Sequence, residues 1–427
     1  MARHAHIVGW GKYVPAKVLT NADFARTLDT SDEWIRSRTG IVERHMASPR
    51  ESTYNQAVKA AWSAIHVADI APSKLELIVV ATVSPDFIFP ATSYLVQDSI
   101  GATHAAAFDI NSGCTGFVYA LAVASDLIVS GAYSNALVVG AETLTRFVDY
   151  KDRGTCILFG DGAGAVILQA TDSSSGMLSS VLGADGSGGG LLQLPAGGSR
   201  NPASHETVKE RMHYIKMNGN EVFRFAVASM TKATNAAVAK AGLTMDDISL
   251  VIPHQANLRI IQSAAKNLKV PMEKMFVNVE RYGNTSAASV PIALCEAIEA
   301  GRVKDGDNLV MVAFGAGLSW GAVTLRWGVP AIVPSRPWWR TARDLLRRPE
   351  AEVKSVARRA GRKIDIWRKP TNGNGNNQED KRQTTEDRRR NTEDEVDTQK
   401  ARVSSVIRLP SSATPDGTKV ESHGKRE

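Results

Sequence analysis

The sequence predicts an α/β protein built from two similar halves. Short apolar runs, typical of buried strands, alternate with longer segments of helical periodicity from residue 1 to about 328. Shifting the chain by 173 positions superimposes the apolar segments 77–79 and 137–139 on 250–252 and 310–312. Two halves made of interior strands predict two stacked sheets with helices around and between them.

The first half begins with an expected strand and turn at 5–14. Ser31 or Asp32 is expected to cap one helix, and Ser52 a second helix that runs to about residue 67. A helix over 117–129 follows the cysteine-containing corner. The other expected strands are 75–83, 107–110, 136–140 and one after the glycine-rich turn within 159–168.

The second half repeats this plan. A helix over 219–241 is expected to end at Gly242, and another to run from about 289 to 301. The 173-residue shift also places Asn111 on Asn284, so the two corners are expected to meet at a pseudo-twofold axis. The expected strands are 248–252, 276–279, 308–314 and 322–327.

Composition and charge exclude several classes of protein. The hydrophobic content of 43% is ordinary for a globular chain, and 427 residues predict two or more domains. Residues 329–427 carry a net charge of +8 and residues 1–328 a net charge of −1, so the basic balance does not indicate nucleic acid binding. The three widely spaced cysteines predict neither a disulfide framework nor a metal site, and favour a reducing cytoplasm. We expect no signal peptide and no membrane span.

Cys114 lies where the apolar strand 107–110 meets the helix 117–129. Gly113 permits the sharp turn before it. Free N–H groups and the helix dipole at the first turn of a helix favour a thiolate, which is the nucleophilic form of cysteine. The alternative is a buried structural cysteine.

Two further polar residues each follow an expected apolar strand. His254 comes after 248–252, and Asn284 after 276–279. Ligands of α/β proteins gather at the carboxyl ends of strands. A thiolate with two such hydrogen-bond donors can perform acyl transfer, although a satisfied core histidine is the alternative for His254.

Six blocks of the sequence together resemble the signature of the β-ketoacyl-acyl carrier protein synthase III family. They are residues 31–41, 112–117, 152–155, 253–259, 282–289 and 313–321. The resemblance implies the thiolase fold, with duplicated βαβαβ halves in a five-layered α-β-α-β-α arrangement. The halves would be 1–172, with Cys114, and 173–328, with His254 and Asn284.

The resemblance also implies a reaction that initiates fatty acid synthesis. Cys114 would take an acyl primer from acyl-CoA, and malonyl-acyl carrier protein would then condense with it to give 3-oxoacyl-acyl carrier protein and CO₂. His254 and Asn284 would hold the malonyl thioester oxygen during decarboxylation. The CoA thioester and the phosphopantetheine-carrying acyl carrier protein would be substrates, with no metal and no permanently bound cofactor.

The same resemblance assigns further residues. The oxyanion loop would be Gly315, Ala316 and Gly317, with Ala316 where the family usually has glycine. The CoA-binding residues would be Trp34, Arg38, Arg153 and Asn257, with Trp34 and Arg153 stacking on the adenine. Phe89 would close the acyl pocket of the partner in a homodimer, and Lys216 and Arg259 would receive the acidic carrier protein. The structural alternatives are a core tryptophan, a loop phenylalanine and solvated charges.

The composition changes after residue 328. Residues 329–369 form a basic linker rich in Trp and Arg, and 370–427 are polar and predicted to be disordered. An apolar helical stripe in the linker consists of Val353, Val356, Ala357, Ala360, Ile364 and Trp367. The hypothesis is a weak membrane-surface contact through 336–369, against a solvated helix or coil.

The sequence leaves other functions open. A polyketide starter synthase or an acyltransferase on the same fold shares Cys114, His254 and Asn284. A scaffold that acts through its C-terminal tail is the non-enzyme alternative. The length and branching of the primer do not follow from the sequence.

Overall fold

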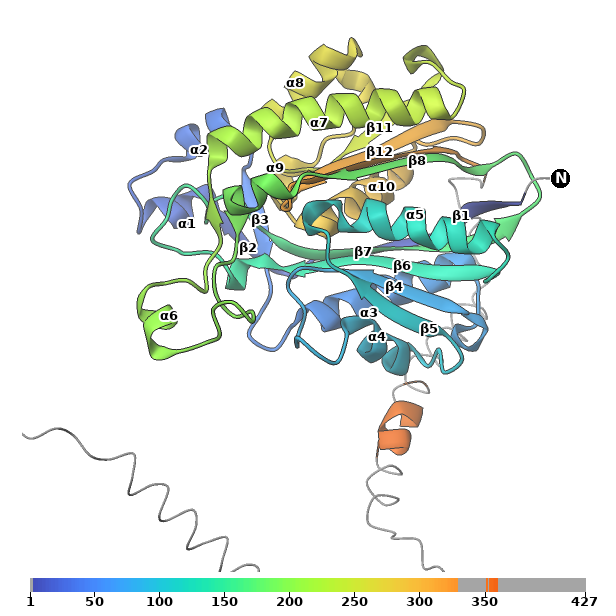
Figure 1. Cartoon of the computed structure of the whole chain (residues 1–427), viewed down its shortest axis with the longest axis horizontal. Coiled ribbons are helices and arrows are strands. Elements are labelled where there is room, and N and C mark those ends of the chain that lie inside the picture. Colours follow the sequence, from blue (N-terminus) through green and yellow to red (C-terminus); the bar gives the residue numbers. More distant parts are fainter. Residues whose placement is uncertain (1–2, 329–350, 352, 360–427) are drawn as a thin grey trace, which may run out of the picture. The chain divides into compact units, whose positions relative to one another are not determined.

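Two β-sheets organise the chain in the computed structural model, which describes residues 3–328, 351 and 353–359. The first sheet has the order β1-β7-β6-β4-β5 and the second β11-β12-β13-β8 (Figure 1). The strands of the first are β1 (His4–Tyr13), β4 (Leu77–Ala81), β5 (Ala106–Ile110), β6 (Asn135–Thr143) and β7 (Asp161–Thr171). Those of the second are β8 (Gly176–Ala184), β11 (Leu250–Pro253), β12 (Asn308–Gly315) and β13 (Ser319–Arg326). Two small ribbons pair β2 (Lys17–Thr20) with β3 (Glu43–Met46), and β9 (Leu192–Gln193) with β10 (Lys216–Met217).

Helices fill the three remaining layers. The outer face of the first sheet is covered by α3 (Thr53–Ala68) and α4 (Thr92–Ile100), and that of the second by α7 (Gly219–Lys240) and α8 (Leu258–Leu268) (Figure 1). Between the sheets lie α5 (Gly116–Val129) and α10 (Ser289–Glu299). The shorter helices are α1 (Asn21–Ala25), α2 (Asp32–Thr39), α6 (His205–Lys209) and α9 (Val279–Tyr282). The predicted five-layered α-β-α-β-α arrangement is confirmed.

The register of the sheets repeats the 173-residue shift seen in the sequence. Ile78 of β4 pairs with Leu137 of β6 in parallel, and Val251 of β11 pairs with Val310 of β12 in parallel. Each member of the second pair is 173 positions after its counterpart. In both sheets the next strand, β7 or β13, then runs antiparallel. The duplication therefore extends to individual strand pairs.

Local sequence accounts for most elements. Every residue of β4 and β6 is buried, as expected for interior strands flanked by helices on both faces. The Ser31 side chain accepts a hydrogen bond from the Trp34 N–H at the start of α2, and Ser52 caps α3. These caps and strands are at their predicted places.

The segment 276–279 is not a strand, contrary to prediction. A single bridge between Val251 and Met275 stands where a fifth strand would pair. The buried side chain of Gln255 takes over the pairing, because its Nε2 donates to the Phe276 carbonyl (3.0 Å) and its Oε1 accepts from the Asn278 N–H (2.9 Å). Because this side chain supplies the hydrogen bonds that the buried backbone groups need, the segment does not have to pair as a strand.

One predicted strand is less buried than expected, and one observed strand was not predicted. β5 was expected to be buried, yet it is the partly exposed edge of its sheet. β8 was not predicted, because its sequence GMLSSVLGA has no clean alternation and contains several small residues. Among the described helices none is both long and apolar enough to cross a bilayer.

A short part of the C-terminal extension is described. Residues 353–359 are helical, and Ser355, Arg358 and Arg359 all bind the Asp98 carboxylate of α4. Val353 and Val356 of the apolar stripe are 67% and 66% exposed. The stripe positions Ala360, Ile364 and Trp367, and the segment 370–427, lie outside the described residues.

Candidate active site

Cys114 lies on the short turn Gly113–Thr115 directly before α5. Gly113 has φ +57°, and a Cβ there would lie 2.9 Å from the Ala316 nitrogen. A Cβ on Gly315 would lie 2.6 Å from the Cys114 nitrogen. The turn and the end of β12 therefore meet backbone against backbone, which requires glycine at both places.

The resting thiol of Cys114 is protonated. Its side chain is buried, and burial raises the pKa of the thiol to about 12. The negative charge of Glu142 adds to this rise, while a hydrogen bond with Ser286 opposes it. Burial thus acts against the thiolate that the helix start was expected to favour, because desolvation disfavours the charged form.

His254 follows β11 and is completely buried. Its Nδ1 lies 2.5 Å from the Ser289 hydroxyl at the start of α10, and its Nε2 has no protein partner. Burial lowers the pKa of the imidazole to about 3, so the ring is neutral at physiological pH. A neutral ring fixed at Nδ1 presents Nε2 as its one available polar atom.

Asn284 is held by its backbone and its side chain together. Its N–H donates to the Leu158 carbonyl (2.8 Å), and its carbonyl accepts from the Gly160 N–H (3.0 Å). The side-chain Oδ1 accepts from the Ser286 N–H (2.8 Å). With Oδ1 occupied, the amide NH₂ is the group left to bind a ligand.

One cavity of about 300 Å³ brings Cys114, His254 and Asn284 together. Its lining also includes Trp34 and Asn257. The structure thus joins one residue of the first half and two of the second in the same space. A thiol nucleophile and two neutral donors around one cavity can perform acyl transfer through oxyanion intermediates.

The residues assigned to CoA gather at the rim of this cavity. The Arg153 guanidinium lies 5.1 Å from the centre of the Trp34 ring and is paired with Asp29. Arg38 and Asn257 line the cavity, and the Asn257 side chain donates to the Arg38 carbonyl (3.1 Å). Three of the four residues thus line the cavity, and Arg153 contacts one of them, Trp34.

The residues assigned to the carrier protein lie next to residues that line this cavity. Arg259 is exposed on the first turn of α8 and lies 5.6 Å over the ring of Phe223, which lines the cavity. Lys216 belongs to β10 and does not line the cavity, whereas its neighbour Met217 does.

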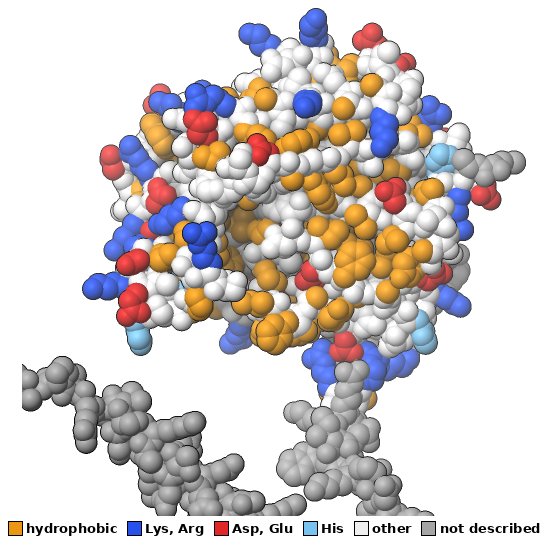
Figure 2. Space-filling view, in the orientation of Figure 1, with side chains coloured by type: hydrophobic (Ala, Val, Ile, Leu, Met, Phe, Trp, Pro, Cys, Tyr) orange, Lys and Arg blue, Asp and Glu red, His pale blue; other side chains and the backbone are white. Residues whose placement is uncertain are grey.

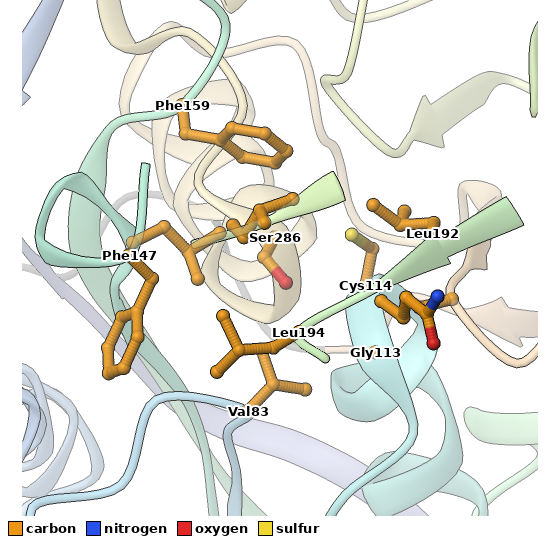
Figure 3. A pocket seen from close by; sticks show the side chains of 12 residues that line it. Val83, Gly113, Cys114, Phe147, Phe159, Leu192, Leu194 and Ser286 are labelled. Carbon is orange, nitrogen blue, oxygen red and sulfur yellow. The ribbon is translucent and has the colours of Figure 1, made fainter. Parts of the chain in front are cut away.

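A second, apolar pocket of about 130 Å³ is also lined by Cys114 (Figure 3). No charged side chain lines it. The lining residues are Val83, Gly113, Cys114, Leu144, Phe147, Phe159, Leu192, Gln193, Leu194, Ile215, Ser286 and Ala316. Phe89 is 85% exposed and lines neither cavity, so the structure does not bring it to the site of its own chain.

Comparisons with known proteins agree with this geometry. The family model for 3-oxoacyl-[acyl-carrier-protein (ACP)] synthase III matches residues 108–186, and the model for its C-terminal part matches 238–327. The β-ketoacyl-[acyl-carrier-protein] synthase III of Symbiobacterium thermophilum is 54% identical over 326 residues, which cover 76% of this chain and 99% of that protein. The chain belongs to the synthase III family. It is a condensing enzyme of the acyltransferase class.

Solved structures place the fold in the same family. The synthase III of Aquifex aeolicus is 47% identical, with a TM-score of 0.70 over 76% of this chain and all of that one. The priming β-ketosynthase of the R1128 polyketide pathway is 35% identical, with a TM-score of 0.72 over 77% of this chain and 98% of that one. The thiolase-like fold predicted from the sequence blocks is thereby confirmed.

Ala316, at the position where the family resemblance implied glycine, has a backbone conformation that does not require glycine. It is not among the described residues with positive φ, so a Cβ meets no backbone restriction. Its carbonyl accepts a hydrogen bond from Ser319 (3.0 Å), which fixes the loop. Gly317, with φ +143°, has the conformation that does require glycine.

Sequence reasoning missed three polar residues beside the predicted ones. Ser289 holds the ring of His254, while Ser286 connects Asn284, Cys114 and Glu142. Glu142 gave one signal, since it is an acidic residue at the end of a run otherwise typical of a buried strand. The two serines belong to the block 282–289 but had no distinguishing feature.

Proposed function

We propose that this synthase III starts fatty acid chains by two steps at Cys114. The thiol takes the acyl group of an acyl-CoA, and malonyl-acyl carrier protein then condenses with the acyl-enzyme to give 3-oxoacyl-acyl carrier protein and CO₂. The observation that carries the proposal is the shared cavity of Cys114, His254 and Asn284. His254 Nε2 has no protein partner, and Cys114 and Asn284 line the same cavity.

The second step requires two neutral donors. Loss of CO₂ turns the malonyl thioester into an enolate, whose oxygen accumulates negative charge. The Gln255 N–H approaches Ser289 Oγ (3.4 Å), so the Ser289 proton is free to point at His254 Nδ1, and Nε2 then carries the ring proton. Nε2–H and the Asn284 NH₂ would hold the oxygen, and each such donor is worth about 10²–10³ in rate.

The acyl-enzyme carbonyl requires its own donors. The backbone of Gly315 and Ala316 touches that of Gly113 and Cys114, which supports an oxyanion hole made by the N–H groups of Cys114 and Ala316. The enolate carbon attacks this carbonyl, the oxyanion forms and collapses, and the sulfur of Cys114 leaves.

The rim supports recognition of both substrates. We propose that the flat face of the Trp34–Arg153 pair stacks on the adenine of CoA, with Arg38 and Asn257 along the cofactor arm. The charges of Lys216 and exposed Arg259 would attract an acidic carrier protein, since charge steers such encounters. No cofactor or metal has a part in either step.

The apolar pocket beyond Cys114 supports an unsubstituted hydrocarbon primer. An acyl chain bound to the sulfur would extend among Val83, Leu144 and Phe147, where a charged chain would lose its solvation without an ionic partner. A volume of about 130 Å³ favours a short chain in this pocket.

A homodimer would explain the exposed apolar residues beside β5. Phe87, Ile88, Phe89 and Tyr94 are 56%, 82%, 85% and 52% exposed. Hydrophobic side chains also gather over the region of β5 (Figure 2), at an edge with no partner strand. Apolar patches next to a free edge strand are typical of interfaces, and Phe89 would then enter the partner's pocket.

Two proposals concern the surroundings of the enzyme. The three cysteines are free and buried, which suits a reducing cytoplasm. Contact of residues 336–369 with a membrane surface is proposed from their Trp and Arg content. Flotation of the full chain with anionic vesicles tests the contact, and equal flotation of a chain ending at residue 328 would contradict it.

Sequential labelling tests the main proposal. The full chain and a Cys114→Ser control are incubated with radiolabelled acyl-CoAs of graded length and then with malonyl-acyl carrier protein. Label is expected on Cys114 for short chains, followed by CO₂ release and transfer of the label to carrier protein. Absence of label with every primer would contradict the enzyme, and label without CO₂ release would favour an acyltransferase.

The similarity to the R1128 priming ketosynthase supports one second candidate, a polyketide starter synthase. Such an enzyme runs the same chemistry with a different carrier protein. Competition between a fatty acid carrier protein and a polyketide carrier protein for the acyl-enzyme separates the two, and preference for the fatty acid carrier is the expected result.

A further inference from the structure

A buried carboxyl group lies behind Cys114 and has no part in the steps above. Glu142, near the end of β6, has no exposed surface. One of its oxygens, Oε2, accepts from the hydroxyls of Thr82 (3.2 Å) and Ser84 (2.5 Å) and from the Val83 N–H (3.2 Å). The other, Oε1, accepts from the Ser286 hydroxyl (3.1 Å).

Ser286 joins this carboxyl group to the nucleophile. Its hydroxyl is also hydrogen-bonded to the Cys114 sulfur, and both residues line the apolar pocket (Figure 3). Its backbone has φ +49°, a conformation that non-glycine residues rarely adopt, and its N–H donates to Asn284. The hydroxyl is therefore held in place between sulfur and carboxylate.

The thiol needs a proton acceptor, and His254 does not meet that need. The imidazole has a pKa of about 3, and its Nδ1 is bound to Ser289. Burial raises the pKa of Glu142 to about 7, against the effect of its hydrogen-bond donors. A base with this pKa is well matched to accept a proton at neutral pH.

We propose that Glu142, acting through Ser286, accepts the proton of Cys114 when the thiol attacks the primer thioester. The inference rests on the proposed acylation of Cys114. As the S–C bond forms, the thiol proton moves to Ser286 Oγ and the serine proton moves to Glu142 Oε1. When the tetrahedral adduct collapses, the bond to the CoA sulfur breaks and the proton returns by the same path to that sulfur.

The relay makes a distinctive prediction for the pH dependence of the free thiol. Among the described contacts of Glu142, Cys114 is the titratable one, and the others are the hydroxyls of Thr82, Ser84 and Ser286 and the N–H groups of Val83 and Ala287. In the relay the attacking species is the protonated thiol with Glu142 ionised, and the fraction of molecules in this state rises up to about pH 7 and is constant above it while the thiol stays protonated. The thiol should therefore gain reactivity up to about pH 7 and then remain level, whereas an isolated thiol gains about tenfold per pH unit below its pKa.

Alkylation of Cys114 by iodoacetamide, followed by mass spectrometry of the full chain between about pH 6 and about pH 9.5, measures this profile. Glu142→Gln removes the acceptor, and Ser286→Ala removes the link. Glu296→Gln is the matched control, because Glu296 is a buried carboxylate bound to Asn278 and Tyr282 on another element. The level region is expected in the wild type and the control, and a rise of about tenfold per unit in both test variants.

A continuous tenfold rise in the wild type, or a level region that persists in Glu142→Gln or Ser286→Ala, would overturn the proposal. Thermal melting checks that the variants fold, and if Glu142→Gln does not fold, the wild type and Ser286→Ala decide. Labelling of the wild type by acyl-CoA is measured alongside. A level region without acyl label would contradict only the proposed function, and label without a level region would contradict only the relay.

Discussion

At the scale of single residues, His254 and Asn284 owe their chemistry to neighbours that occupy their other polar atoms. Ser289 binds His254 Nδ1, and the Ser286 N–H binds Asn284 Oδ1. Each side chain is left with one group for the substrate. The identity of the two residues could be predicted from sequence blocks, but their orientation could not, because it depends on serines that the chain folds back to reach them.

Replacing His254 by Ala should slow decarboxylation by about 10²–10³ and leave acylation of Cys114 close to normal, because the donor is needed only at the enolate. CO₂ release and acyl label measured on the same sample separate the steps. Ser289→Ala is a milder comparison, since it keeps the imidazole ring and removes only the hydrogen bond that fixes its tautomer. It should slow decarboxylation less than His254→Ala does. Equal loss of both steps in His254→Ala would contradict the assigned role.

Gly315→Ala should disable the site, because the new Cβ would lie 2.6 Å from the Cys114 nitrogen. The backbone at the nucleophile must move, and overpacking of this kind typically costs about 1–3 kcal/mol. Gly186→Ala is the control, since a Cβ there has no neighbour within 4 Å. Urea unfolding and the acylation rate check both variants, and a fully active Gly315→Ala would show that the contact is not needed.

At the scale of elements, the interior strands could be predicted from the sequence. The side chain that takes the place of a strand at 276–279 could not. Apolar runs such as 77–81 predict interior strands wherever both faces are covered, and β4 and β11 appear where expected. The segment 276–279 has the same apolar character but is satisfied by the side chain of Gln255, which is distant in sequence. Likewise, the hydrogen bond between Ser286 and Glu142 joins residues 144 positions apart, and no local pattern signals it.

Gln255→Leu should be strongly destabilising. It would leave the carbonyls of Pro253 and Phe276 and the Asn278 N–H without their partner in the core. Each unsatisfied buried group costs about 1–3 kcal/mol, so a loss of several kcal/mol is expected. Denaturant unfolding measures it, with Gln169→Leu on an exposed position of β7 as control. Similar stability of the two variants would show that the side chain does not replace the strand.

At the scale of the whole molecule, the enzyme body was predictable and the attachment of the extension was not. The 173-residue repeat and the family blocks define residues 1 to about 328. In the extension, the sequence offered an apolar stripe for contact with a membrane surface, and its members Val353 and Val356 are exposed. The helix face that contacts α4 carries Ser355 and Arg358, because both side chains bind the Asp98 carboxylate of α4.

Asp98→Asn should release this part of the extension from α4. The variant loses its charge against Arg358 and Arg359, and surface ion pairs of this kind contribute up to about 1 kcal/mol each. Hydrogen bonds from Ser355 and both arginines hold the pKa of Asp98 below its ordinary value, so the attachment is complete at neutral pH and weakens only as the pH falls through that lowered pKa.

Limited trypsin digestion at neutral pH measures the release. Cleavage after Arg358 and Arg359 should be several-fold faster in Asp98→Asn than in the wild type, because both side chains become available to the protease. Asp126→Asn, an exposed position on α5, is the control and should cleave at the wild-type rate. Acylation of Cys114 should be unchanged in all three, since Asp98 lines neither cavity at the thiol. Equal cleavage of wild type and Asp98→Asn would mean that this carboxylate does not hold the extension in solution.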